Sequence, residues 1–383
     1  MRSIVLRLHR WFGLTAAVFL VVTALTGSVL VFQTEIDVLL NPALFRSPGQ
    51  GAVLPAVDLA ARVEAAEPRL RVAGLPMTAT AGRSVLMNVR PRPDPATGKP
   101  YPLRFDQVFV DPVDGTMVGR RGSRTAVVPV IYLLHYTLLD PTGIGRVTLG
   151  IIAILWTVDC LAAWILTLPR GRSPAGWWQS WKVKPGARGF RLAFDLHRAG
   201  ALWLWLFLAV LALSSIAMNL RLQVVVPLLS TVSTVTPSPF TKRGADPART
   251  ATAEAALPFA EIAPRAVIEA QARGWDFGPG LIYHYPAYGL YAVRYWPSAT
   301  DRGSGLGRPI LYFDDRDGRL FEADLPGTGS AADIYLDLQL PLHSGRIAGL
   351  PGRIAICLAG IGITVLTITG VIIWWRKRPM GRR

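Results

Sequence analysis

Four of the five histidines in this chain of 383 residues lie in motifs that occur twice. His9 in LHRWFG and His197 in LHRAG each lie just before a long apolar run. His135 in YLLHYTLLDPTGIGR and His343 in LQLPLHSGRIAGLPGR also precede apolar runs. Neutral imidazole is a good ligand for haem iron. The repeated positions therefore predict two pairs of metal-binding histidines, His9 with His197 and His135 with His343.

Each of these histidines has an arginine nearby in the sequence. Arg10 and Arg198 directly follow the first pair, and Arg146 and Arg353 follow the second pair by 11 and 10 residues. Because a guanidinium group binds a carboxylate through two parallel hydrogen bonds, these arginines could bind haem propionates. A purely topological role at the membrane surface is the alternative explanation for Arg10 and Arg198.

Two further observations bear on the metal chemistry. A divalent metal ion is an alternative occupant, but zinc and iron sites usually include acids or cysteines, and none is next to these histidines in the sequence. No C-x-x-C-H motif is present, which excludes covalently attached c-type haem. Cys160 and Cys357 lie within apolar runs, and we interpret them as reduced core residues.

One acidic residue, Asp159, lies near the middle of an apolar run. A carboxylate within a membrane span is commonly functional, because burying it in hydrocarbon is costly. Asp159 could relay protons, contact a quinol, or fix helix packing through Ser214, Ser215 or Thr364.

The elements that must position these residues are four membrane spans. A spanning helix takes about 20 apolar residues, and runs of this length occur at 11–33, 144–168, 199–226 and 354–375. The segments 1–10, 169–198 and 376–383 contain 15 Lys or Arg residues and a single acid, Asp195. The positive-inside rule therefore places these three segments, and both termini, in the cytoplasm. Since the net charge of +16 is explained by topology, nucleic-acid binding is not expected.

The remaining segments lie on the outer side of the membrane. Alternating and amphipathic patterns in 34–130 and 227–340 predict two small α+β domains. The segments 131–143 and 341–353 are expected to be interfacial and to lead into the next span. VFVDPVDGTMVG and LYFDDRDGRLFE resemble each other, and their Asp-Gly pairs predict hairpin turns. Together with the histidine motifs, this similarity indicates a duplicated unit.

At this point the sequence resembles a known family. The stretches LHRWFGL, LTGSVLVFQTEID, WTVDCLAAWILTLP, WWQSWKVK, FDLHRAGALW and PLHSGRIAGLPGR are similar to the PepSY-associated transmembrane family over nearly the whole chain. Within it, the layout is most similar to the FoxB-type siderophore-iron reductases of the bacterial inner membrane. The resemblance implies an α-helical integral membrane protein with four transmembrane helices and two periplasmic α+β PepSY-like domains.

The resemblance also implies two bis-histidine b-type haems and an activity. The haem of His9 and His197 would lie on the cytoplasmic side, and that of His135 and His343 on the periplasmic side. We expect a ferric-siderophore reductase for iron acquisition, with His135 and His343 at the electron exit and a quinol or a separate reductase as donor. The outer segment supplies four candidate substrate contacts, although an aromatic strand packing the domain is the alternative: Tyr283, His284, Tyr285 and Trp296.

Two other functions remain open from the sequence. PepSY-like domains could bind a peptide or transmit a signal without catalysis, in which case the histidines would be structural. A transporter of the iron chelate is the second alternative, although four spans with one central acid make a poor pore. GSGLGR at 303–308 is predicted to lie in an outer loop without a strand-turn-helix setting, so NAD(P)H or flavin binding is not expected.

Overall fold

The computed structural model describes residues 2–168, 174–249, 253–296 and 305–377 and consists of two compact units. The first, called the membrane unit, comprises Met1–Gln33, Ile131–Thr234 and Tyr335–Arg383. The second, called the sheet unit, comprises Thr34–Val130 and Val235–Ile334. Each unit is therefore assembled from segments that are far apart in the sequence. The GSGLGR stretch begins outside the described residues.

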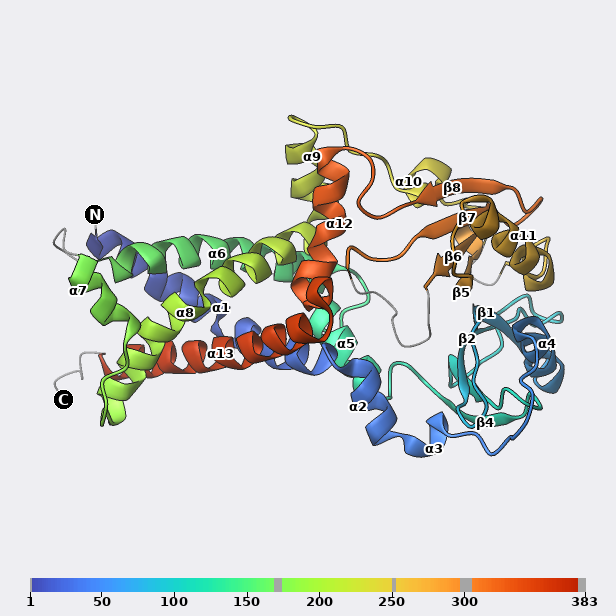
Figure 1. The fold of residues 1–383 in the computed structure, drawn as a ribbon, viewed down its shortest axis with the longest axis horizontal. Helices are drawn as coiled ribbons and strands as arrows, with labels where there is room; N and C mark the ends of the chain where they lie inside the picture. The colour runs from blue at the N-terminus through green and yellow to red at the C-terminus, as the bar shows by residue number, and fades with distance from the viewer. Residues whose placement is uncertain (1, 169–173, 250–252, 297–304, 378–383) are drawn as a thin grey trace. The chain divides into compact units, whose positions relative to one another are not determined.

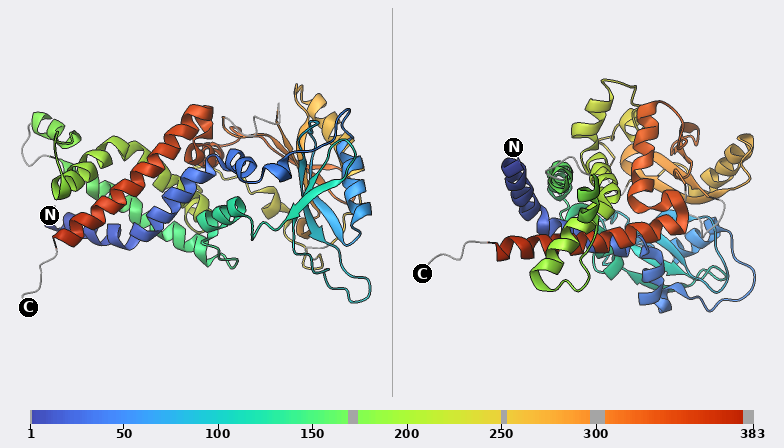
Figure 2. Two further views of the ribbon diagram at one scale, coloured as in Figure 1. Left: turned by 90° about the horizontal axis from the view of Figure 1, so that it is seen from below. Right: turned by 60° about the vertical axis from the view of Figure 1, so that its left-hand side comes forward.

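Four long apolar helices form a bundle in the membrane unit (Figure 1). They are α1 (Arg2–Leu30), α6 (Ile144–Thr167), α8 (Gly189–Asn219) and α13 (Gly349–Arg376). All four are long and apolar enough to cross a membrane, as predicted. Both α1 and α8 pack against α6 and α13, so α1 lies diagonal to α8; Figure 2 shows α1 beside α13.

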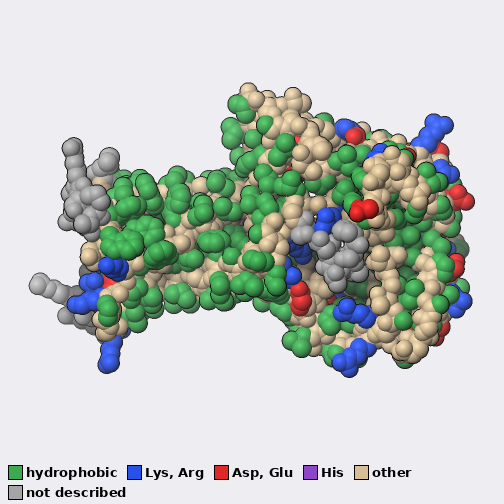
Figure 3. Space-filling model, viewed as in Figure 1, with side chains coloured by type: hydrophobic (Ala, Val, Ile, Leu, Met, Phe, Trp, Pro, Cys, Tyr) green, Lys and Arg blue, Asp and Glu red, His purple; other side chains and the backbone are tan. Residues whose placement is uncertain are grey.

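The outside of the bundle is apolar. Large side chains such as Val18, Leu206 and Leu358 are more than half exposed. Hydrophobic side chains cover this part of the surface in Figure 3, and Lys and Arg gather at the end of the bundle that carries both termini. An apolar belt of this extent would be unstable in water and suits the interior of a bilayer. The chain is a multi-pass membrane protein.

Two helices extend beyond the predicted spans at their polar ends. α1 begins at Arg2 rather than at 11, and α8 at Gly189 rather than at 199. Apolar length predicts only the part of a helix inside hydrocarbon, whereas backbone hydrogen bonds continue through the polar LHR motifs. At its other end α8 stops at Asn219, and a π-helical turn, η2 (Arg221–Val225), is followed by α9 (Val226–Leu229).

Short helices occupy much of the expected interfacial segments. α5 (Val127–Thr137) precedes α6, and α12 (Ala331–Ser344) with η4 (Arg346–Ala348) precedes α13. The basic segment before α8 contains α7 (Pro174–Trp178) and η1 (Gln179–Trp181). These short elements place His135 and His343 on helices.

The sheet unit contains one antiparallel sheet of eight strands in the order β4-β3-β2-β1-β5-β6-β7-β8. The first half consists of β1 (Leu70–Pro76), β2 (Val85–Pro91), β3 (Gln107–Val110) and β4 (Met117–Arg121). The second half consists of β5 (Pro279–Tyr285), β6 (Leu290–Tyr295), β7 (Ile310–Asp314) and β8 (Leu320–Asp324). The halves join where β1 pairs with β5, with Gly74 opposite Tyr283. A Cβ atom at Gly74 would lie 2.7 Å from the Tyr283 ring, so the joint requires glycine there.

Our expectation of two separate outer domains therefore needs correction. Helices α4 (Ala56–Ala66) and α11 (Phe259–Ala272) pack on the shared sheet, and one hydrophobic core contains side chains from both halves. A separate four-stranded half would expose the backbone groups of β1 or β5 at an edge, and pairing the two satisfies both. The remaining short helices are α2 (Gln33–Leu40), α3 (Pro42–Phe45), α10 (Pro239–Arg243) and η3 (Pro286–Tyr288).

The two Asp-Gly motifs are hairpin turns with the same support. Arg62 of α4 donates a hydrogen bond to the carbonyl oxygen of Asp114 at 2.7 Å, and Arg265 of α11 donates to that of Asp317 at 2.8 Å. The following glycine, Gly115 in the first turn, has the positive φ that such a turn requires. These aspartates are therefore turn residues, as predicted. The contact between helix and turn occurs once in each half of the sheet.

Candidate metal centres in the membrane unit

Two histidines face each other across the bundle, near the end that carries both termini. His9 lies on α1 and His197 on α8, the diagonal helices. Their ring centroids are 5.9 Å apart, and the ring planes are inclined by 52°. The fold thus brings together two residues that are separated by most of the first half of the chain.

A second pair lies just before the other two long helices. His135 on α5 and His343 on α12 have ring centroids 6.2 Å apart and planes inclined by 59°. Leu138 and Leu139, which follow α5, both have positive φ, at 54° and 63°. This conformation is uncommon and strained for a leucine, and it ends α5 soon after His135.

The spacing within each pair fits two imidazoles bound to opposite faces of one metal. A metal–imidazole bond is about 2.0 Å long, and adding the ring radius on both sides places the centroids about 6 Å apart. Among the described residues, no group of three or more His, Cys, Asp or Glu side chains is placed to hold a bare metal ion. Two opposed imidazoles at this spacing would fit a metal whose remaining ligands come from a macrocycle, such as haem.

The first pair is oriented by hydrogen bonds at Nδ1. His9 Nδ1 lies 2.8 Å from Asp159 Oδ1, and His197 Nδ1 lies 2.8 Å from the carbonyl oxygen of Leu366. A carboxylate and a carbonyl oxygen accept, so Nδ1 of both rings carries the proton. Metal-binding histidines generally use their second nitrogen in this way.

The second pair is oriented by hydroxyl groups. His135 Nδ1 lies 3.0 Å from Thr26 Oγ1, and His343 Nδ1 lies 2.9 Å from Ser214 Oγ. Both hydroxyls donate their single proton to a backbone carbonyl of their own helix, at 2.7 Å. They must therefore accept from the imidazole. In all four histidines the Nε2 lone pair is left for a ligand, and no hydrogen bond within the described chain reaches Nε2.

Glycines leave room beside one ring of each pair. A Cβ atom at Gly27 would lie 3.1 Å from His135 Cε1, and one at Gly370 would lie 2.9 Å from His197 Cε1. Both distances are shorter than ordinary carbon–carbon contacts. Another glycine in the spans, Gly360, instead allows close packing of α13 on Ser28 and the backbone of α1.

The family model of the PepSY-associated TM region matches residues 6–377, which is nearly the whole chain. The chain belongs to the PepSY-associated TM family. No curated protein matches it. The matched region of this PepSY-associated TM protein includes all four paired histidines.

The four predicted carboxylate-binding arginines differ in their surroundings. Arg353 donates to the carbonyl oxygen of Val31 at 2.8 and 3.0 Å and stacks on Phe32. Arg198 donates to Asp195 at 3.2 Å. Among the described residues, the side chain of Arg146 has one long contact, of 3.4 Å, with the Tyr136 hydroxyl. Arg10 is exposed. Buried Nε atoms of Arg146 and Arg198 lack a partner in the described part of the structure and remain able to donate to an anionic group.

The contact of Asp159 corrects two sequence-based expectations. An acid does lie beside one of the paired histidines, although none is adjacent in sequence. Its hydrogen-bond partner is His9 rather than Ser214, Ser215 or Thr364. The roles of Thr26 and Ser214 were missed, although a signal was present, since each follows a histidine of the first pair by 17 residues.

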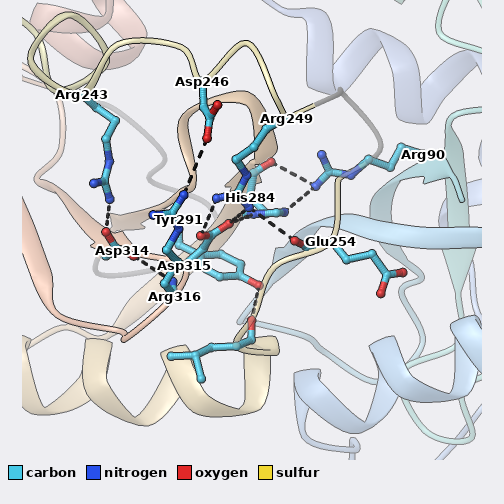
Figure 4. Close-up of polar contacts among 11 residues, drawn as sticks. Arg90, Arg243, Asp246, Arg249, Glu254, His284, Tyr291, Asp314, Asp315 and Arg316 are labelled. Atoms are coloured by element: carbon cyan, nitrogen blue, oxygen red, sulfur yellow. Dashed lines mark hydrogen bonds and ion pairs between the residues drawn. The ribbon is translucent and has the colours of Figure 1, made fainter. Parts of the chain in front are cut away.

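The fifth histidine is a buried core residue of the sheet unit (Figure 4). His284 is 2% exposed, its Nε2 donates to Asp315 Oδ2 at 2.8 Å, and its Nδ1 accepts from Arg90 at 3.0 Å. Both ring nitrogens are therefore occupied. Trp296 is also buried, so neither it nor His284 presents a side chain to a substrate, which agrees with the alternative that these residues pack the domain. Tyr283 and Tyr285 are half-buried neighbours.

The charges around His284 form a buried network. Asp315 also accepts two hydrogen bonds from Arg249, at 2.9 and 2.5 Å. Burial lowers the pKa of His284, so the ring is neutral in the folded protein. Burial alone would raise the pKa of Asp315, but hydrogen bonds from His284 and Arg249 hold it below its ordinary value. The network consists of a carboxylate, two guanidinium groups and a neutral imidazole, and Arg90 of β2 connects it to the first half of the sheet.

Proposed function

We propose that this protein is a di-haem b reductase of the bacterial inner membrane, which passes electrons across the membrane to a ferric siderophore in the periplasm. The observation that supports this best is the geometry of the two histidine pairs. Their ring centroids lie 5.9 and 6.2 Å apart, and each Nδ1 is fixed by a hydrogen bond. Membership of the PepSY-associated TM family supports the membrane location that the proposal requires.

In this proposal four side chains hold two b-type haems. His9 and His197 bind one, and His135 and His343 bind the other. A bound haem supplies reversible one-electron chemistry. The chain's own contribution is to fix each imidazole through its Nδ1 hydrogen bond, which leaves Nε2 for the metal, and to surround the site with apolar side chains. Arg10, Arg146, Arg198 and Arg353 would neutralise the propionates.

The distribution of charge supports the orientation. Basic residues lie where α1 begins and just before α8, such as Arg7, Lys184 and Arg188, and Lys and Arg gather at this end of the bundle in Figure 3. The positive-inside rule places this end in the cytoplasm. The His9–His197 pair then lies on the cytoplasmic side, where a quinol or a separate reductase supplies electrons. The His135–His343 pair lies on the periplasmic side, where electrons leave.

The substrate assignment rests on the chemistry of iron release. Siderophores hold Fe(III) through hard oxygen ligands and hold Fe(II) less tightly, so reduction by one electron releases the ion.

The proposal also includes an origin for the sheet unit, in which two PepSY-like halves arose by duplication. The repeated contacts of Arg62 with Asp114 and of Arg265 with Asp317 support this origin.

The test is a dithionite-reduced-minus-oxidised visible spectrum of the purified full-length protein, with haem quantified per chain. We expect a sharp low-spin b-type spectrum and two haems per chain, and reoxidation when a ferric siderophore is added. The double variant His135→Ala/His343→Ala should keep one haem and lose fast reoxidation. A colourless protein after expression with adequate haem would overturn the proposal and favour peptide binding or signalling.

A further inference from the structure

Two positions that correspond in the repeated halves carry different hydrogen-bond acceptors. Asp159 on α6 follows Arg146 by 13 residues, and Leu366 on α13 follows Arg353 by the same number. Each accepts the Nδ1 hydrogen of one histidine of the first pair, at 2.8 Å. One acceptor is a carboxylate, and the other is a neutral backbone carbonyl. The bundle is therefore asymmetric in charge at this pair.

The second pair shows no such asymmetry. His135 and His343 both donate to a neutral hydroxyl, that of Thr26 or of Ser214. Of the four Nδ1 atoms, only that of His9 faces a carboxylate.

Helix packing does not account for the acid. Asp159 is buried, and its one ion-pair or hydrogen-bond partner among the described residues is His9. A carboxylate buried without a cationic partner is destabilising. The corresponding position is occupied by an apolar residue, Leu366, whose backbone orients His197 equally well. The fold thus orients an imidazole here without an acid, and the carboxylate needs another explanation.

The chemistry of the ligand supplies that explanation. A carboxylate that accepts from Nδ1 raises the basicity of the imidazole at Nε2. A more basic ligand stabilises ferric over ferrous iron, and hydrogen bonding to the axial ligand is one way in which proteins tune haem potential. We infer that Asp159 is a positioning residue that lowers the reduction potential of the His9–His197 site below that of the His135–His343 site. This inference depends on the proposed function, because it requires haem at both sites.

The consequence is a direction for the electron. The first site gives up an electron more readily than the second, so transfer from the His9–His197 pair to the His135–His343 pair is downhill. The asymmetry belongs to the protein itself and does not depend on donor or acceptor.

The experiment is a potentiometric titration of the full-length protein followed by its visible spectrum. The wild type should titrate in two steps. Asp159→Asn keeps an acceptor but removes the charge, and it should raise the lower midpoint toward the upper one while both haems remain. Asp159→Glu keeps the charge and should stay near the wild-type midpoints. Thr26→Val, at the other pair, should leave the lower midpoint in place.

Several results would overturn the inference. A wild type with two haems but one midpoint would do so, as would an Asp159→Asn protein with both midpoints unchanged. If the Asp159→Asn protein loses a haem, the Asp159→Glu protein provides the test. If that protein keeps two haems but its lower midpoint is raised, the negative charge does not set the potential, and the inference is wrong. A wild type without haem would instead refute the proposed function, which separates the two failures.

Discussion

Thr26 and Ser214 hold equivalent places on α1 and α8, each 17 residues after a histidine of the first pair and each hydrogen-bonded to a histidine of the second. Seventeen helical residues span roughly 25 Å, which is close to the hydrocarbon thickness of about 30 Å. Each of these helices therefore carries a candidate ligand of the first site and orients a candidate ligand of the second. The two candidate sites are held near opposite faces of the membrane by the rigidity of α1 and α8.

The pairing of the histidines predicts which variants behave alike. His9→Ala and His197→Ala should each remove the same haem and leave the other, because a single imidazole remains at that site. His135→Ala and His343→Ala should both remove the second haem. Haem content per chain and the reduced spectrum measure this. Loss of the same haem from His9→Ala and His343→Ala would contradict the pairing.

The glycines beside the rings predict steric variants. Gly27→Leu should displace His135 and remove the second haem, because even a Cβ atom would lie 3.1 Å from the ring. Gly13→Ala is the matched control on the same helix, since its Cβ atom would make only an ordinary contact of 3.7 Å with Asp159. Haem quantification of both proteins tests the prediction. Full haem content in Gly27→Leu would show that this space is not needed.

The buried network of the sheet unit predicts a large loss of stability. Asp315→Asn leaves the partly buried Arg249 and the buried His284 without their carboxylate partner, which should reduce the free energy of unfolding by about 3–5 kcal/mol. Arg319→Gln changes a highly exposed side chain and should have an effect within about 0.5 kcal/mol. Thermal unfolding in detergent, followed by near-ultraviolet circular dichroism, compares the two. Equal effects would mean that the network contributes little.

The same network predicts a pH dependence. Burial lowers the pKa of His284 below the ordinary value of 6.5, so below that pH the unfolded chain binds a proton that the folded chain does not. Stability of the sheet unit should therefore fall as the pH drops below about 6.5, by up to about 1.4 kcal/mol per pH unit. The lowered pKa of Asp315 adds a further loss at more acidic pH. Unfolding of wild type and His284→Gln between pH 7 and 5 measures the difference, and parallel curves would contradict this role.

The proposed orientation predicts which residues are accessible from outside the cell. In a variant with Cys160 and Cys357 replaced by Ala, a cysteine at Thr97 should react with an impermeant maleimide in spheroplasts. A cysteine at Lys184 should react only after the membrane is opened. Both positions are exposed in the protein. The reverse pattern would invert the assignment of the two histidine pairs to membrane faces.

The length of the apolar runs predicted the four spans. The repeated motifs predicted which histidine lies opposite which. Strand pairing was not predictable in the same way. Nothing in Leu70–Pro76 or Pro279–Tyr285 indicates that these strands pair with each other, because backbone pairing at a sheet edge leaves no fixed residue pattern. The contact of Asp159 with His9 depends on the packing of α1 against α6, which is a property of the assembled bundle. Burial of His284 likewise depends on Arg90 of the other half.

The pairing of β1 with β5 has a consequence for biogenesis. β1 ends at Pro76 and β5 begins at Pro279, so about 200 residues must be synthesised in between, which takes roughly 10–40 s at usual translation rates. During that time the two long helices α6 and α8 must be inserted into the membrane, and the edge of β1 remains unpaired. An unpaired edge recruits other strands. In the proposed orientation, export of the first half of the sheet would therefore create a period in which a periplasmic chaperone, or rapid insertion of α8, protects the nascent protein from aggregation.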